Sequence, residues 1–141
     1  MEGLKMATVE NLIQVETDGT ISFGNYELPK KTKAMGFEVG GNLYDLRSFS
    51  EITKLNKDEA LVYESIPGTS VHSFNMTDKL IEFEVAGIAE TQITMELSPN
   101  TDYNLFIEDM KIGKIASSLA GKIIFSVGCN KDLKKVAIKR A

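Results

Sequence analysis

Hydrophobic and polar residues alternate along most of this chain, which is the pattern of β-strands with one buried face. The segment KLIEFEVAG (79–87) is typical, because three apolar residues alternate with two glutamates. TISFGNYEL (20–28) follows an Asp18-Gly19 turn and has the same period. Further strands are predicted at 9–15, 42–48, 59–66, 70–76, 91–97, 102–108, 111–116, 122–128 and 133–139.

Turn residues separate these segments at short, regular spacing, as in an all-β sandwich. We therefore predict a mainly antiparallel β-sandwich with at most one short helix, formed as a single domain over 1–141. A subdivision near 98–100, at Ser98-Pro99-Asn100, remains an alternative. The helical candidate is 48–60, where Ser50 is a suitable N-cap residue.

The formal net charge of −4 over 141 residues predicts repulsion of polyanions, so no nucleic-acid partner is expected. The basic C-terminal segment alternates like a strand, and we predict that 133–139 is a solvated edge strand protected by its lysines. No apolar stretch has the length of a membrane helix or a signal sequence. The single cysteine, Cys129, fits a reducing compartment, and the predicted location is cytoplasmic. Either Met1 or Met6 is the native start.

The segment VYESIPGTSVHSF (62–74) contains the only histidine of the chain, His72. Pro67-Gly68 suits the centre of a type II turn, which predicts a hairpin in which Tyr63 faces His72 across the strands. In that register Glu64 points to the opposite face, so it forms no dyad with His72.

Three segments together resemble a family of small bacterial proteins that carry the label endosialidase. They are VETDGTISFGNYELPKKTK (15–33), ALVYESIPGTSVHSF (60–74) and TDYNLFIEDMKIGKIASSLAGKIIFSV (101–127). The third segment is also similar to the β-sandwich accessory modules of carbohydrate-active enzymes. Where similar sequences have Asp-Gly, this chain has Asp109-Met110, which argues against a tight primed turn at that point.

The chain lacks the residues that sialidase chemistry uses. Such enzymes resemble one another in an arginine triad for the sugar carboxylate, because arginine binds a carboxylate with two parallel hydrogen bonds. This sequence has only Arg47 and Arg140, no tryptophan and no Asp box. The resemblance therefore implies a fold more strongly than it implies that activity.

Other catalytic schemes find little support. His72 has Ser65, Ser70 and Ser73 near it in sequence, and a small hydrolase centred on His72 is the weakest hypothesis that we carry. Glu82 and Glu84 share one face of a strand, where a solvated surface is a simpler explanation than a pair of glycosidase carboxylates. No metal-ligand spacing or phosphate-binding loop occurs, and no cofactor is expected.

Binding is the remaining class of function. Tyr44, Tyr63, Tyr103 and His72 are the candidate binding residues, since amphipathic rings offer flat surfaces to sugars or partners. The primary hypothesis is a non-catalytic interaction or structural module that self-associates as a homodimer through a sheet edge. The alternative is a carbohydrate-binding or carbohydrate-processing protein.

Overall fold

The computed structural model describes residues 8–141, so Met1 and Met6 lie outside the described residues. The described residues contain no helix, and therefore none that could cross a membrane. They form β1 (Ile13–Val15), β2 (Ile21–Phe23), β3 (Thr32–Val39), β4 (Asn42–Phe49), β5 (Ile52–Lys57), β6 (Ala60–Ile66), β7 (Thr69–Met76), β8 (Leu80–Gly87), β9 (Glu90–Glu96), β10 (Asp102–Ile107), β11 (Met110–Ala116), β12 (Lys122–Gly128) and β13 (Lys134–Arg140).

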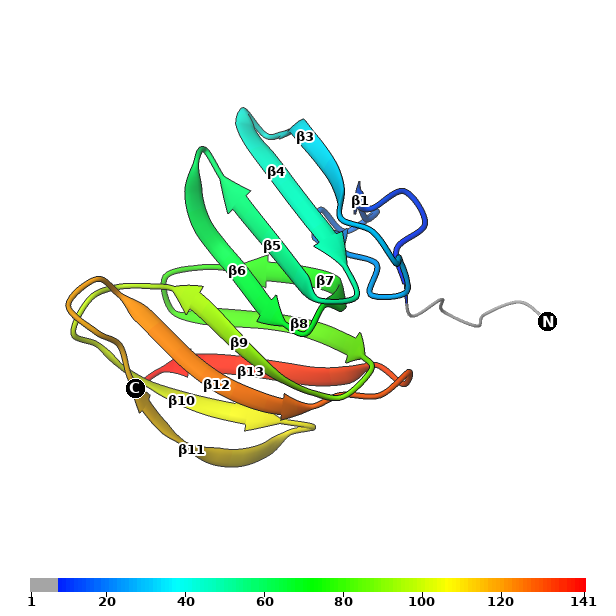
Figure 1. Cartoon of the computed structure of the whole chain (residues 1–141). Helices are drawn as coiled ribbons and strands as arrows, with labels where there is room; N and C mark the ends of the chain where they lie inside the picture. The colour runs from blue at the N-terminus through cyan, green and yellow to red at the C-terminus, as the bar shows by residue number, and fades with distance from the viewer. Residues whose placement is uncertain (1–7) are drawn as a thin grey trace.

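Two antiparallel sheets make up the fold, which confirms the predicted all-β class. The seven-stranded sheet has the order β1-β2-β7-β8-β13-β10-β11, and the six-stranded sheet has the order β12-β9-β6-β5-β4-β3. In Figure 1, β9 and β12 cross in front of β8 and β13, and the hairpins β3–β4 and β5–β6 extend beyond them. Strands from both sides of 98–100 share both sheets, because β9 pairs with β12 and β8 pairs with β13.

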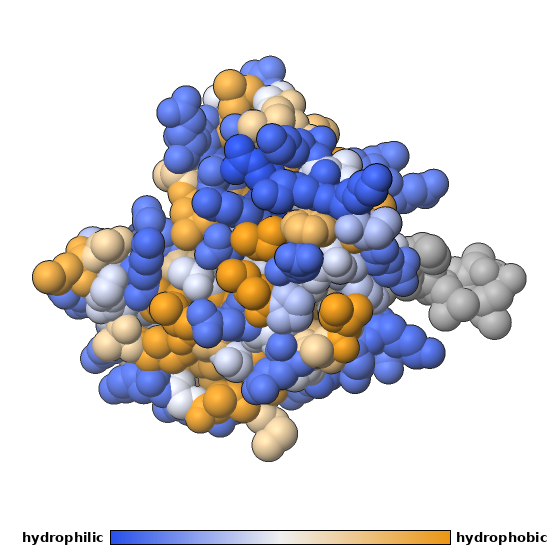
Figure 2. All heavy atoms as spheres, in the orientation of Figure 1, coloured by the Kyte–Doolittle hydropathy of each residue, from blue (hydrophilic) through white to orange (hydrophobic). Residues whose placement is uncertain are grey.

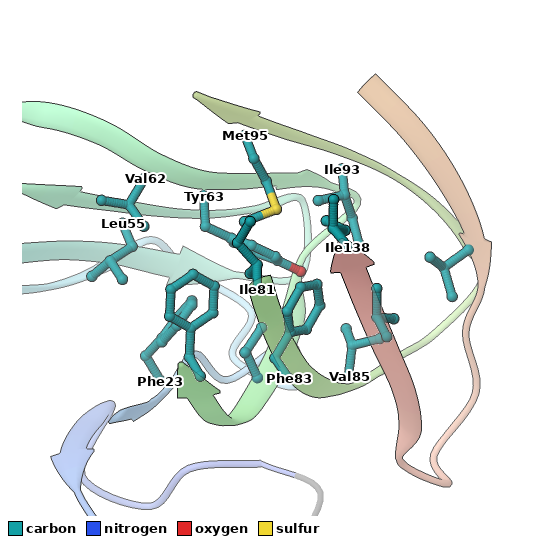
Figure 3. Packing of buried hydrophobic residues seen from close by; sticks show 14 of the residues in the cluster. Phe23, Leu55, Val62, Tyr63, Ile81, Phe83, Val85, Ile93, Met95 and Ile138 are labelled. Carbon is teal, nitrogen blue, oxygen red and sulfur yellow. The ribbon is translucent and has the colours of Figure 1, made fainter. Parts of the chain in front are cut away.

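The core lies between the sheets and receives the inward residues of both. Figure 3 shows Phe23, Tyr63, Phe83, Met95 and Ile138 packed together, and all five are buried. The ring of Tyr63 meets Phe23 edge to face at a centroid distance of 5.3 Å, and it meets Phe83 at 5.7 Å. Burying a large apolar side chain contributes roughly 1.5–3 kcal/mol, so this shared core holds the two sheets together.

A network of buried hydroxyl groups crosses the core beside the hydrophobic cluster. Thr69 Oγ1 is within 2.8 Å of the Tyr63 hydroxyl and within 2.7 Å of Ser65 Oγ. Thr53 Oγ1 donates to the Thr69 carbonyl oxygen at 2.7 Å and is bonded to Ser48 Oγ at 2.8 Å. These groups come from β4, β5, β6 and β7, so the network ties one sheet to the other at the point where the chain passes between them.

The predicted hairpin over 62–74 is wrong, because β6 and β7 belong to different sheets. Pro67-Gly68 carries the chain across the sandwich, and Gly68 does not have the positive φ that a type II turn requires. Its N–H donates to the Ser50 carbonyl at 3.0 Å, and a Cβ there would overlap the backbone of Phe49. Turn residues signal a change of direction but do not identify the strand that pairs next.

Two further expectations for strand position are corrected. The helical candidate 48–60 contains strand β5, since the buried Thr53 and Leu55 alternate with partly buried residues and fill the core side of the sheet. Segment 133–139 is not an edge strand, because β13 lies between β8 and β10. Its alternation showed one solvated face, and a central strand of a sandwich has such a face as well.

Candidate binding cleft between the sheets

A cleft of about 770 Å³ opens at one end of the sandwich, between the two sheets. Its floor is apolar and consists of side chains that also belong to the core: Ile21, Val62, Phe74, Ile81 and Tyr103. Its rim is largely polar, with six polar residues from four different connections beside the 41% exposed Met76: Asn42, Lys57, Asn75, Asp78, Glu96 and Ser98. Since the described chain does not fill this space, the two layers form a site with an apolar base and a polar mouth.

One wall is formed by the tips of two hairpins, β3–β4 and β5–β6. Gly40 and Gly41 make the first turn with φ values of 57° and 85°, a conformation that glycine adopts without steric cost. The Leu43 N–H donates to Asp58 Oδ1 at 2.9 Å, and the Asp58 N–H donates to the Leu43 carbonyl at 2.7 Å. Asp58 therefore fixes the two tips to each other and holds Tyr44 in the wall.

The opposite wall is held by local hydrogen bonds in the β7–β8 and β9–β10 connections. Thr77 Oγ1 accepts from the Leu80 N–H at 3.1 Å, which closes the turn that carries Asp78. The Ser98 N–H donates to the Tyr103 hydroxyl at 3.1 Å. Because these bonds are made within the chain, the wall is formed before any ligand arrives.

Tyr44 is the aromatic residue of the cleft wall that is only partly buried. Burial raises the pKa of its hydroxyl, and the nearby Asp58 carboxylate raises this pKa further. The hydroxyl is therefore protonated throughout the neutral range and available as a hydrogen-bond donor. Lys57, Asp78 and Glu96 add both signs of charge to the rim.

The structure divides the four candidate binding residues into two groups. Tyr44 and Tyr103 line the same cleft, although Tyr103 is 1% exposed and contributes only to the floor. Tyr63 is fully buried in the core. His72 is also buried and lies across from Glu84 of β8, so it does not face Tyr63 as predicted.

The rim residues were missed by sequence reasoning because they form no motif. Asn42, Lys57, Asn75 and Asp78 lie at the ends of strands far apart in the chain, and only the order of strands brings them together. Polar residues at several strand ends are the one signal that the sequence contains. That signal cannot identify which ends meet.

A second hollow of about 350 Å³ lies beside the bulge in β7 and includes Asp18, Ser73, Glu82 and Glu84. Glu84 is the cross-strand partner of both His72 and Lys135, which places it between two basic side chains. Among residues 8–141, no three histidine, cysteine or acidic side chains are close enough to hold a metal ion.

Cys129 is buried, and this burial raises the pKa of its thiol. A thiol with a raised pKa is a poor nucleophile at neutral pH, because the thiolate is the reactive form.

No protein-family model matches this chain, and neither a curated protein nor a solved structure was found to be similar to it. The resemblance to the endosialidase-labelled family stays a prediction.

Proposed function

We propose that this protein is a non-catalytic binding module of the cytoplasm and that its ligand occupies the cleft between the sheets. The observation that carries this proposal is the combination of a buried apolar floor with a polar rim from four connections. Ligand sites in proteins are commonly concave, largely apolar and formed in advance, with a few polar groups that orient the ligand. The cleft volume of about 770 Å³ is within the usual range for such sites.

A second, narrower proposal is that the ligand of the cleft is a carbohydrate. Sugars bind through the apolar face of the ring and through hydroxyl groups, and the cleft offers the Tyr44 ring and the Asn42 amide on one wall and the Asp78 and Glu96 carboxylates on the opposite wall. The resemblance to accessory modules of carbohydrate-active enzymes supports the same ligand class. The absence of tryptophan counts against tight binding of a sugar, because the chain has no indole ring on which a sugar could stack.

The test begins with an array of neutral and sialylated oligosaccharides, followed by titration of each hit against the isotope-labelled protein by NMR. We expect shifts to concentrate at the cleft and the Tyr44→Ala variant to lose at least tenfold in affinity. Leu43→Ala is the matched control, because Leu43 directly precedes Tyr44 on β4, is 50% exposed and does not line the cleft.

A blank array, together with no hydrolysis of a sialoside, would exclude the carbohydrate form. A fragment screen of small apolar and mixed compounds then tests the wider proposal. Binding that leaves the cleft resonances unmoved, or binding that Tyr44→Ala does not weaken, would show that the ligand site lies elsewhere.

A further inference from the structure

The outer face of the six-stranded sheet carries a row of side chains that crosses all six strands. Cross-strand pairing places these residues side by side, in the order Lys33, Arg47, Lys54, Glu64, Thr94 and Ile124. They point away from the core, because Leu46 and Thr53, which precede Arg47 and Lys54 along their strands, are fully buried. Three cations therefore lie next to one another at the β3 end of the sheet.

The centre of this row lacks an acidic partner. Within residues 8–141, the Arg47 guanidinium forms neither a hydrogen bond nor an ion pair. Glu64 lies opposite Lys54 and not opposite Arg47. The Asp45 carboxylate, on the same face of β4, accepts the Gly36 N–H at 2.7 Å. Since Arg47 is partly buried, its guanidinium loses water without gaining an acceptor in return.

A row of apolar side chains borders the cations on the same face. Phe49 and Ile52 are cross-strand partners, and both are only partly buried. Ile66, two residues after Glu64 on β6, is 54% exposed. Figure 2 shows hydrophobic residues beside hydrophilic ones over the region where β4 and β5 lie in Figure 1. Exposed apolar side chains with a polar border are typical of protein interaction surfaces.

Folding alone does not account for this arrangement of charges. Like charges directly opposite each other destabilise a sheet, and Arg47 has a cation on both sides. The chain as a whole has 20 acidic residues and 16 basic ones, yet it places three basic residues together here. Local arrangements that cost stability are concentrated at functional sites.

We infer that this face binds an acidic segment of another protein, in which carboxylates lie beside apolar side chains. The carboxylates complement the cation row, and an arginine at its centre binds a carboxylate with two parallel hydrogen bonds. The apolar side chains of the segment cover Phe49, Ile52 and Ile66. A phosphate compound would balance the cations but leave this apolar row exposed, which favours a protein segment. The face lies on the opposite side of the sheet from the cleft, so the two sites are independent.

The test is a selection from a random peptide library displayed on phage, with the full chain immobilised and the Arg47→Glu protein used to remove peptides that bind elsewhere. We expect a consensus in which acidic residues adjoin apolar ones. Synthetic peptides of that consensus should bind the wild-type chain, lose at least tenfold in affinity for Arg47→Met, and bind less tightly at high salt. Arg140→Met is the matched control, because Arg140 is the only other arginine and lies on the other sheet, opposite Tyr103.

Several results would overturn the inference. The selection would do so if it yielded no peptide whose binding depends on Arg47, or a consensus without acidic residues. Pyrophosphate that binds the wild-type chain but not Arg47→Met, while no acidic peptide is selected, would identify a phosphate site in place of a protein partner. A wild-type chain that dimerises by sedimentation equilibrium, and that Arg47→Met returns to the monomer, would identify a second copy as the occupant in place of another protein.

Discussion

The hydroxyl of Tyr63 lies inside the sandwich, 2.8 Å from Thr69 Oγ1, on a side chain with no exposed surface. Its ring packs against three other aromatic rings, and its hydroxyl joins the network that links β6 to β7. The same amphipathic character that makes tyrosine a candidate for binding thus serves folding at this position. Tyr44 shares the residue type but stands in the cleft wall, and only its position in the sheet separates the two.

Burial raises the pKa of the Tyr63 hydroxyl well above its usual value, against the opposing effect of its hydrogen bonds to Thr69 and Ser65. The unfolded chain ionises its tyrosines near pH 10, whereas folded Tyr63 keeps its proton there. The free energy of unfolding should therefore fall above about pH 10, by about 1.4 kcal/mol per pH unit for this group. Tyr63→Phe should remove that slope and cost about 1 kcal/mol at neutral pH through the lost hydrogen bond.

Urea denaturation of both proteins between neutral pH and pH 11 measures this difference. Tyr44→Phe is the control, because Tyr44 is only partly buried and should change the alkaline decline less. An equally steep decline in wild type and Tyr63→Phe would contradict the assignment.

At the scale of the element, alternation predicts eleven of the thirteen strands found among residues 8–141, but it does not predict which strands pair with each other. β3 was missed because a register shift between Ala34 and Phe37 interrupts its alternation, and β5 was missed because its segment was interpreted as a helix. A primed turn does connect β10 and β11, at Glu108 and Asp109, whose φ values are 51° and 65°. It lies one residue before the Asp109-Met110 step considered in the sequence, so Met110 keeps an extended backbone.

The outer face of the six-stranded sheet sets three cations side by side. Lys33 pairs with Arg47, Arg47 pairs with Lys54, and only Lys54 has an acidic partner, Glu64. Figure 2 shows a hydrophilic band over the region of these strands. Like charges directly opposite each other destabilise a sheet, whereas opposite charges contribute roughly 0.2–1 kcal/mol per pair.

Arg47→Glu turns two repulsive pairs into attractive ones, and we expect the free energy of unfolding to rise by about 1 kcal/mol at low salt. The gain should shrink at high salt, because exposed charges are screened. Arg140→Glu is the control, since its cross-strand partner is Tyr103 rather than a cation. Urea denaturation at two salt concentrations makes the measurement, and a loss of stability in Arg47→Glu at low salt would contradict it.

Across the whole molecule, the cleft follows from strand order, which the sequence does not reveal. The cleft depends on four connections that meet only because the tips of β3–β4 and β5–β6 stand opposite β7–β8 and β9–β10. Composition and period predicted the class of fold, since they reflect burial residue by residue. Site geometry depends on long-range pairing, for which a single sequence carries no direct signal.

Strand order also bears on the boundary that the sequence suggested near 98–100. A fragment ending at Ser98 would lack all four strands from β10 through β13. In that fragment β8 would have lost its partner β13, and β9 would have lost its partner β12. Core residues Ile81, Phe83 and Ile93 would then lose the members of their buried cluster that β10, β12 and β13 contribute. We expect residues 1–98 alone to be unfolded by circular dichroism and NMR dispersion, and mixing with residues 99–141 to restore the fold. A cooperative unfolding transition in the isolated 1–98 fragment would instead identify it as a subdomain that folds on its own, because it would show that the pairings across residue 98 are not needed.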